Sequence, residues 1–461
     1  MENNTKHMNR RDFLKVMGVG TASAAVVACS SDKVAKEIAG SKKELGKMTC
    51  RKNEKGEDVS ILGYGCMRWP TSEPDENGQK TIDQEAVNAM VDYAIEHGVT
   101  YFDTAPIYVQ GKSEAATGIA LKRHPRESFT IATKLSNQRG DPTFERSVKM
   151  YKASFENLQV DYIDYYLLHS IGGGKNPMET LQKRFFDNGV LDFLVKEREA
   201  GRIRNLGWSF HGDVNVFDHM LKLHDEGKYH WDFVQIQMNY IDWKHAHDRD
   251  EEEVNAEYLY TELEKRGIPV VIMEPLLGGA LATINDHFST RLLEKRPYES
   301  IASWAFRFCG SHPGVLTVLS GMTYMEHLQD NVATFSSLEP LAGEDFELLE
   351  QIAKEYVNFP LVPCTACQYC MPCPYGINIP AIFAHYNKCV NEGYVNEDTQ
   401  DPEYRKARRA YLVSLDRSVE TIRQADHCVG CGQCAPACPQ HIDIPGRLRR
   451  IDKFTDKLRR N

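Results

Sequence analysis

The stretch Val99-Thr100-Tyr101-Phe102-Asp103-Thr104-Ala105-Pro106-Ile107-Tyr108 decides how the chain is interpreted. Its first four residues form an apolar run, which predicts a short buried strand. Pro106 cannot continue a central strand, because proline has no backbone N–H to donate. Asp103 and Tyr108 therefore lie across a strand-to-loop junction. A fixed carboxylate and a tyrosine hydroxyl at the mouth of a parallel sheet are suited to moving a proton.

The same unit of strand and helix recurs along the chain. Predicted strands cover 61–65, 99–102, 129–133, 163–168, 203–207, 233–238, 270–273 and 315–319, and predicted helices cover 83–97, 114–121, 144–158, 181–200, 214–224, 254–265, 301–308 and 325–335. Eight alternations over roughly 290 residues are typical of a (β/α)8 TIM barrel, which we assign to residues 49–342. An open doubly wound sheet is the alternative. The lack of a glycine-rich phosphate loop after the first strand favours the barrel.

Two further polar residues follow predicted barrel strands, and together with the first pair they form a chemical set. Tyrosine alone is a poor acid at neutral pH, with a reference pKa of about 10. The ammonium of Lys134 would lower that pKa, and Asp103 would hold the lysine charged. His169 can donate a hydrogen bond to a carbonyl oxygen as negative charge develops on it. The set predicts carbonyl chemistry, in which Tyr108 handles the proton and a separate donor supplies hydride.

Phe102-Asp103-Thr104-Ala105 with Tyr108, Ala132-Thr133-Lys134 and Leu167-Leu168-His169 resemble the tetrad motifs of the aldo/keto reductases. The resemblance covers about residues 49–340 and implies NADPH or NADH as cofactor, bound without a Rossmann domain. It also implies that Gln235 hydrogen-bonds the nicotinamide carboxamide, with Ser209 nearby. The remaining cofactor-binding residues that it implies are Ser320, Gly321, Thr323, His327, Asp330 and Asn331.

Eight of the thirteen cysteines fall into two tight runs after residue 360, and such spacing indicates metal ligands rather than disulfides. The second run, Cys428-x2-Cys431-x2-Cys434-x3-Cys438-Pro439, matches the bacterial ferredoxin motif and favours one or two [4Fe–4S] clusters over zinc. By the two-cluster rule one set is Cys364, Cys367, Cys370 and Cys438, and the other is Cys428, Cys431, Cys434 and Cys373. Cys389 is an alternative to Cys373.

Residues 343–461 are therefore predicted to form a small, mostly α-helical ferredoxin-like domain. A subgroup of aldo/keto reductases is similar in carrying such a C-terminal extension. The basic tail from Arg447 to Arg460 predicts a solvated helix face, with docking of an acidic electron carrier as the alternative.

The N-terminus resembles a targeting segment. Arg10 and Arg11 precede a short apolar run that ends in Val26-Val27-Ala28-Cys29. This pattern predicts a twin-arginine signal over 1–29 with a lipobox, followed by a linker over 30–48. A frayed amphipathic helix is the alternative. Use of the signal would make the protein periplasmic or a lipoprotein held to the membrane through Cys29, and without it the protein would be cytoplasmic.

The composition is ordinary for a soluble protein, with 42% hydrophobic and 26% charged residues. These fractions do not narrow the class of function. A net charge of −10 argues against nucleic acid as a partner. We expect an oxidoreductase that interconverts a small carbonyl compound and an alcohol, with clusters that relay electrons to or from a redox partner protein. The alternative is an electron-transfer or nucleotide-sensing subunit with a catalytically silent barrel.

Overall fold

The computed structural model describes residues 45–72, 81–138, 140–249, 253–358, 360–438, 440 and 442–460. The predicted signal at 1–29 and most of the predicted linker lie outside the described residues. The described residues from Gly46 onward form one compact unit. Within these ranges, no helix is both long enough and apolar enough to cross a bilayer.

Eight parallel strands close into a barrel in the order β10-β3-β4-β5-β6-β7-β8-β9, which confirms the predicted (β/α)8 fold. The strands are β3 (Leu62–Gly65), β4 (Tyr101–Asp103), β5 (Thr130–Leu135), β6 (Ile163–Ile171), β7 (Ile203–Phe210), β8 (Phe233–Gln237), β9 (Val270–Met273) and β10 (Val315–Ser320). An antiparallel hairpin of β1 (Cys50–Lys52) and β2 (Asp58–Ser60) precedes them. Side chains such as Tyr101, Tyr165 and Phe233 fill the barrel interior, so it is a packed core and not a pore.

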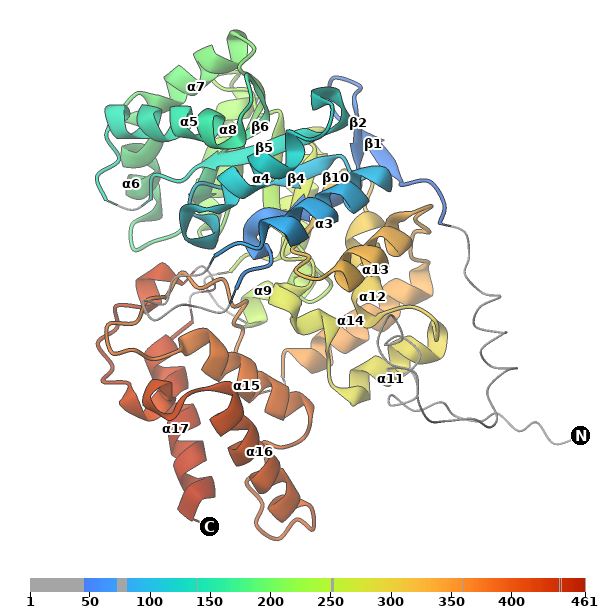
Figure 1. The fold of residues 1–461 in the computed structure, drawn as a ribbon, viewed down its shortest axis with the longest axis vertical. Helices are drawn as coiled ribbons and strands as arrows, with labels where there is room; N and C mark the ends of the chain where they lie inside the picture. Colours follow the sequence, from blue (N-terminus) through green and yellow to red (C-terminus); the bar gives the residue numbers. More distant parts are fainter. Residues whose placement is uncertain are drawn as a thin grey trace, which may run out of the picture. The chain divides into compact units, whose positions relative to one another are not determined.

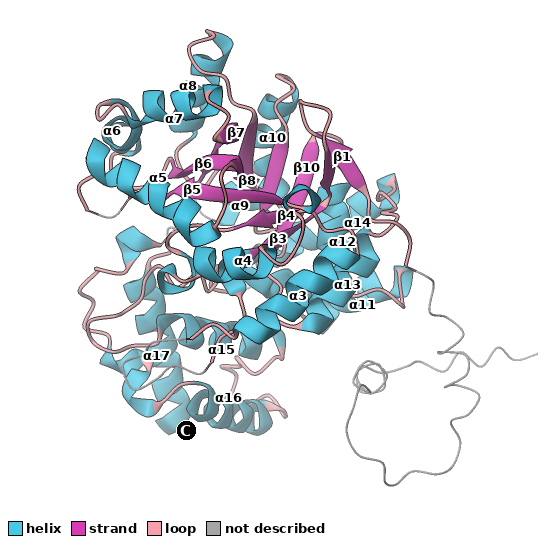
Figure 2. Cartoon of the chain, turned by 45° about the horizontal axis from the view of Figure 1, so that its top comes forward, coloured by secondary structure: helices cyan, strands magenta, loops and turns pink. Residues whose placement is uncertain are grey.

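Helices surround the strands, as Figure 2 shows. They are α3 (Gln84–Glu96), α4 (Ser113–Leu121), α5 (Phe144–Leu158), α6 (Pro177–Leu181), α7 (Val190–Glu199), α8 (Val214–Asp225), α10 (Ala256–Glu264), α12 (Ile301–Gly310) and α13 (Met325–Phe335). The single helix predicted over 181–200 is wrong. The segment is divided into α6, a π-helical turn (Gln182–Phe186) and α7, because Gly189 adopts a φ of 72° that ends regular helix.

Three helices were not predicted from the sequence. They are α9 (Asp242–Arg249), α11 (Asp286–Lys295) and α14 (Gly343–Tyr356). Side chains of α14, including Leu349 and Ile352, belong to the hydrophobic core shared by the barrel strands and helices.

The C-terminal residues build a second hydrophobic core, which begins at Val362. Its helices are α15 (Ile379–Asn391), α16 (Tyr404–Ser418) and α17 (Ile444–Arg460), drawn in orange to red in Figure 1. The basic helix α17 is solvated on one face only. Its Leu448, Ile451 and Phe454 are buried in this second core, so the helix has a structural role as well as a charged surface.

Candidate active site and iron–sulfur domain

Four polar side chains singled out in the sequence lie at the C-terminal end of the barrel. Asp103 is the last residue of β4, Lys134 is the last but one of β5, and His169 lies near the end of β6. Tyr108 begins the short turn Tyr108–Gly111 after β4. Parallel strands of a barrel end at one rim, so positions far apart in the sequence come together in space.

Lys134 and Asp103 form a buried ion pair. The lysine Nζ lies 2.5 Å from Asp103 Oδ1 and donates a second hydrogen bond to the Thr104 carbonyl at 2.9 Å. Neither side chain reaches solvent, with exposed fractions of 0% and 3%. Burial lowers the pKa of Lys134 and raises the pKa of Asp103, and each partner opposes the shift of the other. The charged form of each residue is therefore stabilised by the charge of the other.

The ring of Tyr108 packs against Lys134 and against His169. Lys134 Nζ lies 5.0 Å from the centre of the Tyr108 ring, and the His169 ring meets it edge-on at 6.0 Å. Burial raises the pKa of Tyr108 well above its usual range, and Asp103, Tyr369 and Glu274 act in the same direction. The expected lowering of this pKa by lysine is wrong, because burial raises the pKa and the Asp103 carboxylate beside the lysine raises it further. A raised pKa favours the protonated form of Tyr108 at neutral pH, which is the form that donates a proton.

His169 is held from two sides by residues that the sequence did not single out. Its Nδ1 lies 2.5 Å from Ser136 Oγ, and Arg184 donates hydrogen bonds to the carbonyls of His169 and Ser170. Burial lowers the pKa of His169 well below its usual range, with the charges of Lys134 and Arg184 adding to the effect. The imidazole is therefore neutral near pH 7. Ser136 directly follows the end of β5, two positions after Lys134, which is the only sequence signal for its role.

The residues implied for the nicotinamide end lie on neighbouring strands. Ser209 of β7 and Gln235 of β8 are paired in register. Ser209 Oγ accepts a hydrogen bond from the Ser170 amide at 2.7 Å. Gln235 is 2% exposed, and its Oε1 has no hydrogen-bond donor among the described residues. A buried amide oxygen without a donor fits an N–H group supplied by a ligand, such as a carboxamide.

The residues implied for the adenosine end follow β10, and only some of them lie close to the barrel rim. Asn331 donates to Ser320 Oγ at 2.9 Å, and Thr323 Oγ1 donates to the Arg68 carbonyl at 3.0 Å. Asp330 accepts from Ser300, and His327 is exposed. Ser320, Thr323 and Asn331 thus lie close to the rim, whereas Asp330 is engaged with the start of α12.

The eight late cysteines separate into two groups. Cys364, Cys367, Cys370 and Cys438 line one small cavity, together with apolar side chains such as Phe383 and Ile442. In the other group, the thiol of Cys434 has its pKa raised first by burial and then by the neighbouring Cys428, Cys373 and Cys431. Four thiols facing an apolar cavity are a donor set that fits an iron–sulfur cubane. The alternative ligand Cys389 instead contacts His385 and Ser414.

The loop that carries the first three cysteines contacts the barrel rim. Arg68, just after β3, donates a hydrogen bond from Nη2 to the Thr365 carbonyl at 2.6 Å. Gln440, two residues after Cys438, donates to Gln237 Oε1 of β8 at 3.0 Å. The first cysteine group therefore lies beside the same end of the barrel as Tyr108.

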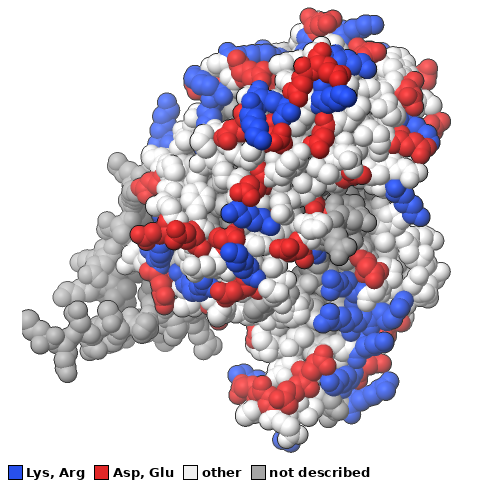
Figure 3. All heavy atoms as spheres, turned by 180° about the vertical axis from the view of Figure 1, so that it is seen from behind, with Lys and Arg blue, Asp and Glu red and all other residues white. Residues whose placement is uncertain are grey.

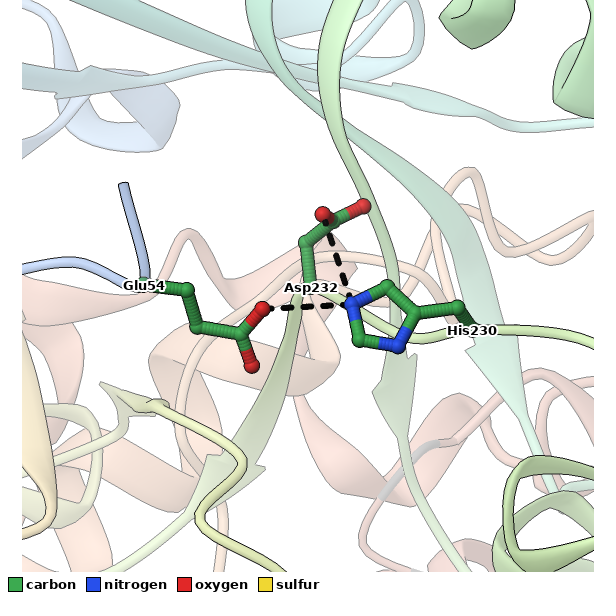
Figure 4. A group of neighbouring side chains, drawn as sticks. All are labelled: Glu54, His230 and Asp232. Carbon is green, nitrogen blue, oxygen red and sulfur yellow. Dashed lines mark hydrogen bonds and ion pairs between the residues drawn. The ribbon is translucent and has the colours of Figure 1, made fainter. Parts of the chain in front are cut away.

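Figure 4 shows a separate group of possible metal ligands, Glu54, His230 and Asp232. His230 Nε2 lies 3.2 Å from Glu54 Oε2 and 3.7 Å from Asp232 Oδ1. Asp232 already accepts hydrogen bonds from Arg198 and from the Leu206 amide. The group ties the β1–β2 turn to the start of β8, at the end of the barrel opposite Tyr108, and we interpret it as a structural ion pair.

Fold and domain content together define a barrel oxidoreductase with an appended iron–sulfur domain. Residues 61–354 match the model of the aldo/keto reductase family, and residues 363–442 match that of the 4Fe-4S dicluster domain. The chain belongs to the aldo/keto reductase family.

Relatives agree with this assignment. The chain is 31% identical over 163 residues to probable aldo-keto reductase 1 of Glycine max, and spans 42% of that protein. It is 25% identical over 314 residues to L-galactose dehydrogenase of Arabidopsis thaliana, covering 64% of this chain and 90% of the relative.

Two solved structures share the barrel. The holo form of an aldo-keto reductase from Bacillus halodurans is 25% identical, with a TM-score of 0.50 over 66% of this chain and 96% of that one. A Klebsiella pneumoniae aldo/keto reductase in complex with NADP and acetate is 22% identical, with a TM-score of 0.50 over 67% and 95% of the two chains.

Proposed function

We propose that the protein interconverts a carbonyl and an alcohol at Tyr108. One observation carries this proposal: a tyrosine that stays protonated lies between the buried Lys134–Asp103 pair and a neutral His169, at the rim where barrel enzymes perform their chemistry.

Each residue has a distinct task in the proposed reaction. Tyr108 donates its phenolic proton to the carbonyl oxygen as that oxygen gains negative charge. In the tautomer whose Nδ1 accepts from Ser136, 2.5 Å away, His169 presents Nε2–H to the same oxygen and stabilises the charge. Lys134 stabilises the phenolate that Tyr108 leaves behind, and Asp103 keeps the lysine charged and fixed. In the oxidation direction the same groups act in reverse.

A nicotinamide nucleotide, NADP or NAD, would supply the hydride. Gln235 would accept from its carboxamide and Ser209 would lie beside it, while the segment from Ser320 to Asn331 would face the adenosine part. The unpartnered Gln235 Oε1 supports this placement. So does the shared fold of the Klebsiella enzyme that was solved with NADP.

Each cluster would carry one electron at a time, so two clusters would together pass two electrons per turnover. The first cysteine group lies at the barrel rim, whereas Cys431 of the second group is exposed, as are the apolar side chains of Ile422 and Val429 in the same domain. We infer from this order that electrons would pass between the rim and a redox partner protein through the first cysteine group and then the second. The exposed side near Cys431 is where that partner would bind.

The charge of the domain supports an acidic partner. Residues 361–461 contain fourteen basic and eleven acidic residues, a net charge of +3, against −10 for the whole chain. Figure 3 shows Lys and Arg side chains gathered over the C-terminal helices. Steering by such a surface weakens as salt rises, so the rate of electron transfer from an acidic carrier should fall steeply with ionic strength.

Substrates of this site would be small and polar. L-galactose dehydrogenase among the relatives suggests a sugar-like alcohol or carbonyl, which is the class to test first.

Replacing Tyr108 with Phe tests the proposal, because it removes one hydroxyl and little else. Carbonyl turnover should fall by about 10²–10⁴-fold, while iron content and the free energy of unfolding stay as in wild type. Tyr101→Phe is the matched control, since that buried hydroxyl has no hydrogen-bond partner among the described residues and faces the barrel interior. Unchanged turnover in Tyr108→Phe would sink the proposal and favour a silent barrel that senses nucleotide or transfers electrons.

We also propose export in the folded state, supported by Arg10-Arg11 before the apolar run that ends at Cys29. Folding before export suits a protein whose clusters are inserted during folding. Cell fractionation of an Arg10→Lys, Arg11→Lys variant tests this. Export that is unaffected by both substitutions would contradict it.

A further inference from the structure

We propose that the cysteine loop 364–370 and a bound dinucleotide compete for one strip of the barrel rim, so that docking of the iron–sulfur domain controls nucleotide binding. The strip is defined by Gly278, after β9, and Gly321, after β10. The inference rests on the proposed function, because it takes the nicotinamide to lie at Gln235 and the adenosine part to lie along residues 321–331.

Barrel topology fixes the path that a dinucleotide must take. Gln235 belongs to β8, and Gly321 directly follows β10. Strand β9 is hydrogen-bonded to both β8 and β10, so it lies between them. Any molecule that extends from Gln235 to residues 321–331 therefore passes the end of β9 and the loop that follows it, Glu274 to Gly279.

Thr365 occupies that crossing. A Cβ placed on Gly278 would lie only 2.7 Å from the Thr365 Cβ and 2.8 Å from its carbonyl carbon. Real Cβ atoms do not approach that closely, so the two backbones touch and leave no layer between them. Thr365 is 2% exposed, and Gly278 is fixed from below by a 2.6 Å hydrogen bond from its amide to Glu274.

Arg68 fills the other half of the strip. Its aliphatic stem covers Gly321, where an added Cβ would lie 2.9 Å from the arginine Cδ. Its guanidinium reaches across to donate to the carbonyls of Thr365 at 2.6 Å and of Gly278 at 3.5 Å. Arg68 thus links the rim to the cysteine loop and occupies the space beside the segment that would hold the adenosine part.

When the loop is docked, the deep part of the site at Gln235 stays as it is. The path along the rim, past the end of β9, is closed by Thr365 and Arg68. A dinucleotide can enter only if Thr365 and Arg68 move away. The two binding events are then linked with opposite sign, and by reciprocity anything that weakens docking strengthens nucleotide binding by the same factor. A docked domain brings the first cysteine group to the rim, and an undocked domain gives the rim to the nucleotide.

The test uses the anaerobically purified, cluster-loaded full chain and NADPH as the probe. Equilibrium titration by nucleotide fluorescence would compare wild type with Arg68→Ala and Gln440→Ala, which remove two separate contacts between the iron–sulfur domain and the barrel rim. Both variants should bind NADPH about tenfold tighter or more. Arg198→Ala is the control, because this arginine also donates to a backbone carbonyl but at the opposite end of the barrel.

Hydrogen exchange of residues 364–370 gives a second readout that does not depend on activity. Adding NADPH should increase deuterium uptake in this loop. Reduced uptake would overturn the proposal, because it would mean that the loop closes over a bound nucleotide. Equal affinity in wild type and Arg68→Ala would also overturn it. If no variant binds NADPH, both this inference and the nicotinamide part of the proposed function fail, whereas the role of Tyr108 is judged separately by the Tyr108→Phe turnover.

Discussion

Replacing Asp103 with Asn removes the one carboxylate that pairs with Lys134 in the described part of the chain, while keeping the size of the side chain. The lysine is fully buried and makes two polar contacts, to Asp103 Oδ1 at 2.5 Å and to the Thr104 carbonyl at 2.9 Å. Breaking one partner of a buried pair leaves an uncompensated charge, which costs about 3–5 kcal/mol. We therefore expect the free energy of unfolding at pH 7 to fall by about this amount.

The loss should depend on pH in a defined direction. In wild type, burial lowers the pKa of Lys134 and Asp103 opposes that shift. In Asp103→Asn the largest influence that opposes burial is removed, so the folded-state pKa falls further below the unfolded value of about 10.4. Between these two values the unfolded chain binds more protons than the folded chain. The stability of the variant therefore rises with pH up to about 10, and its deficit against wild type narrows.

Urea unfolding between pH 6 and 10 measures both effects. Asp92→Asn is the matched control, since Asp92 pairs with Arg123 at the surface and its loss should cost at most about 1 kcal/mol. An Asp103→Leu, Lys134→Met double variant should recover much of the stability but not the carbonyl turnover. A loss below 1 kcal/mol in Asp103→Asn, or a deficit that grows with pH, would refute the assignment of a charged, mutually dependent pair.

Three further outcomes are expected. His169→Gln should remove a fall in stability as pH drops through about 6.5, because the wild-type imidazole is neutral when folded and protonates when unfolded; stability curves from pH 5 to 8 measure this. Cys438→Ser should reduce iron and acid-labile sulfide from about eight to about four per chain, and zinc without iron in wild type would contradict the cluster assignment. Gly278→Ala should expose the loop 364–370 to protease, because its Cβ meets Thr365. Gly279→Ala, which shares a positive φ but has no atom within 4 Å of its added Cβ, should not.

The elements that could be predicted are those whose pattern is local. Helix α5 has the predicted bounds, 144–158, because Thr143 caps its start and Gln159 ends it in a left-handed conformation. Strand β9 also has its predicted bounds. Helices α9, α11 and α14 were missed because they lie outside the repeating strand–helix unit, and the pattern of that unit does not predict them.

The candidate site divides in the same way. Asp103, Lys134 and His169 were identifiable because each follows its own apolar strand, and the fold then places the strand ends together. Arg184 gave no such signal, because it acts on the backbone of His169 through hydrogen bonds that depend on tertiary structure. The contact of Gly278 with Thr365 is harder still to predict. It joins two backbones 87 positions apart, and the only trace in the sequence is a glycine.

Two buried hydrogen-bond acceptors in the site receive no donor from the docked loop. Asp103 Oδ2 and Gln235 Oε1 both lack a donor among the described residues, and each such atom costs about 1–3 kcal/mol when left unpaired. Thr365 and Arg68 close the rim above them, yet neither supplies a donor to either oxygen. Docking therefore fills the strip at the rim without satisfying the polar groups below it. A ligand that reaches the depth of the site can recover that cost, and this gain is what would allow it to displace the loop.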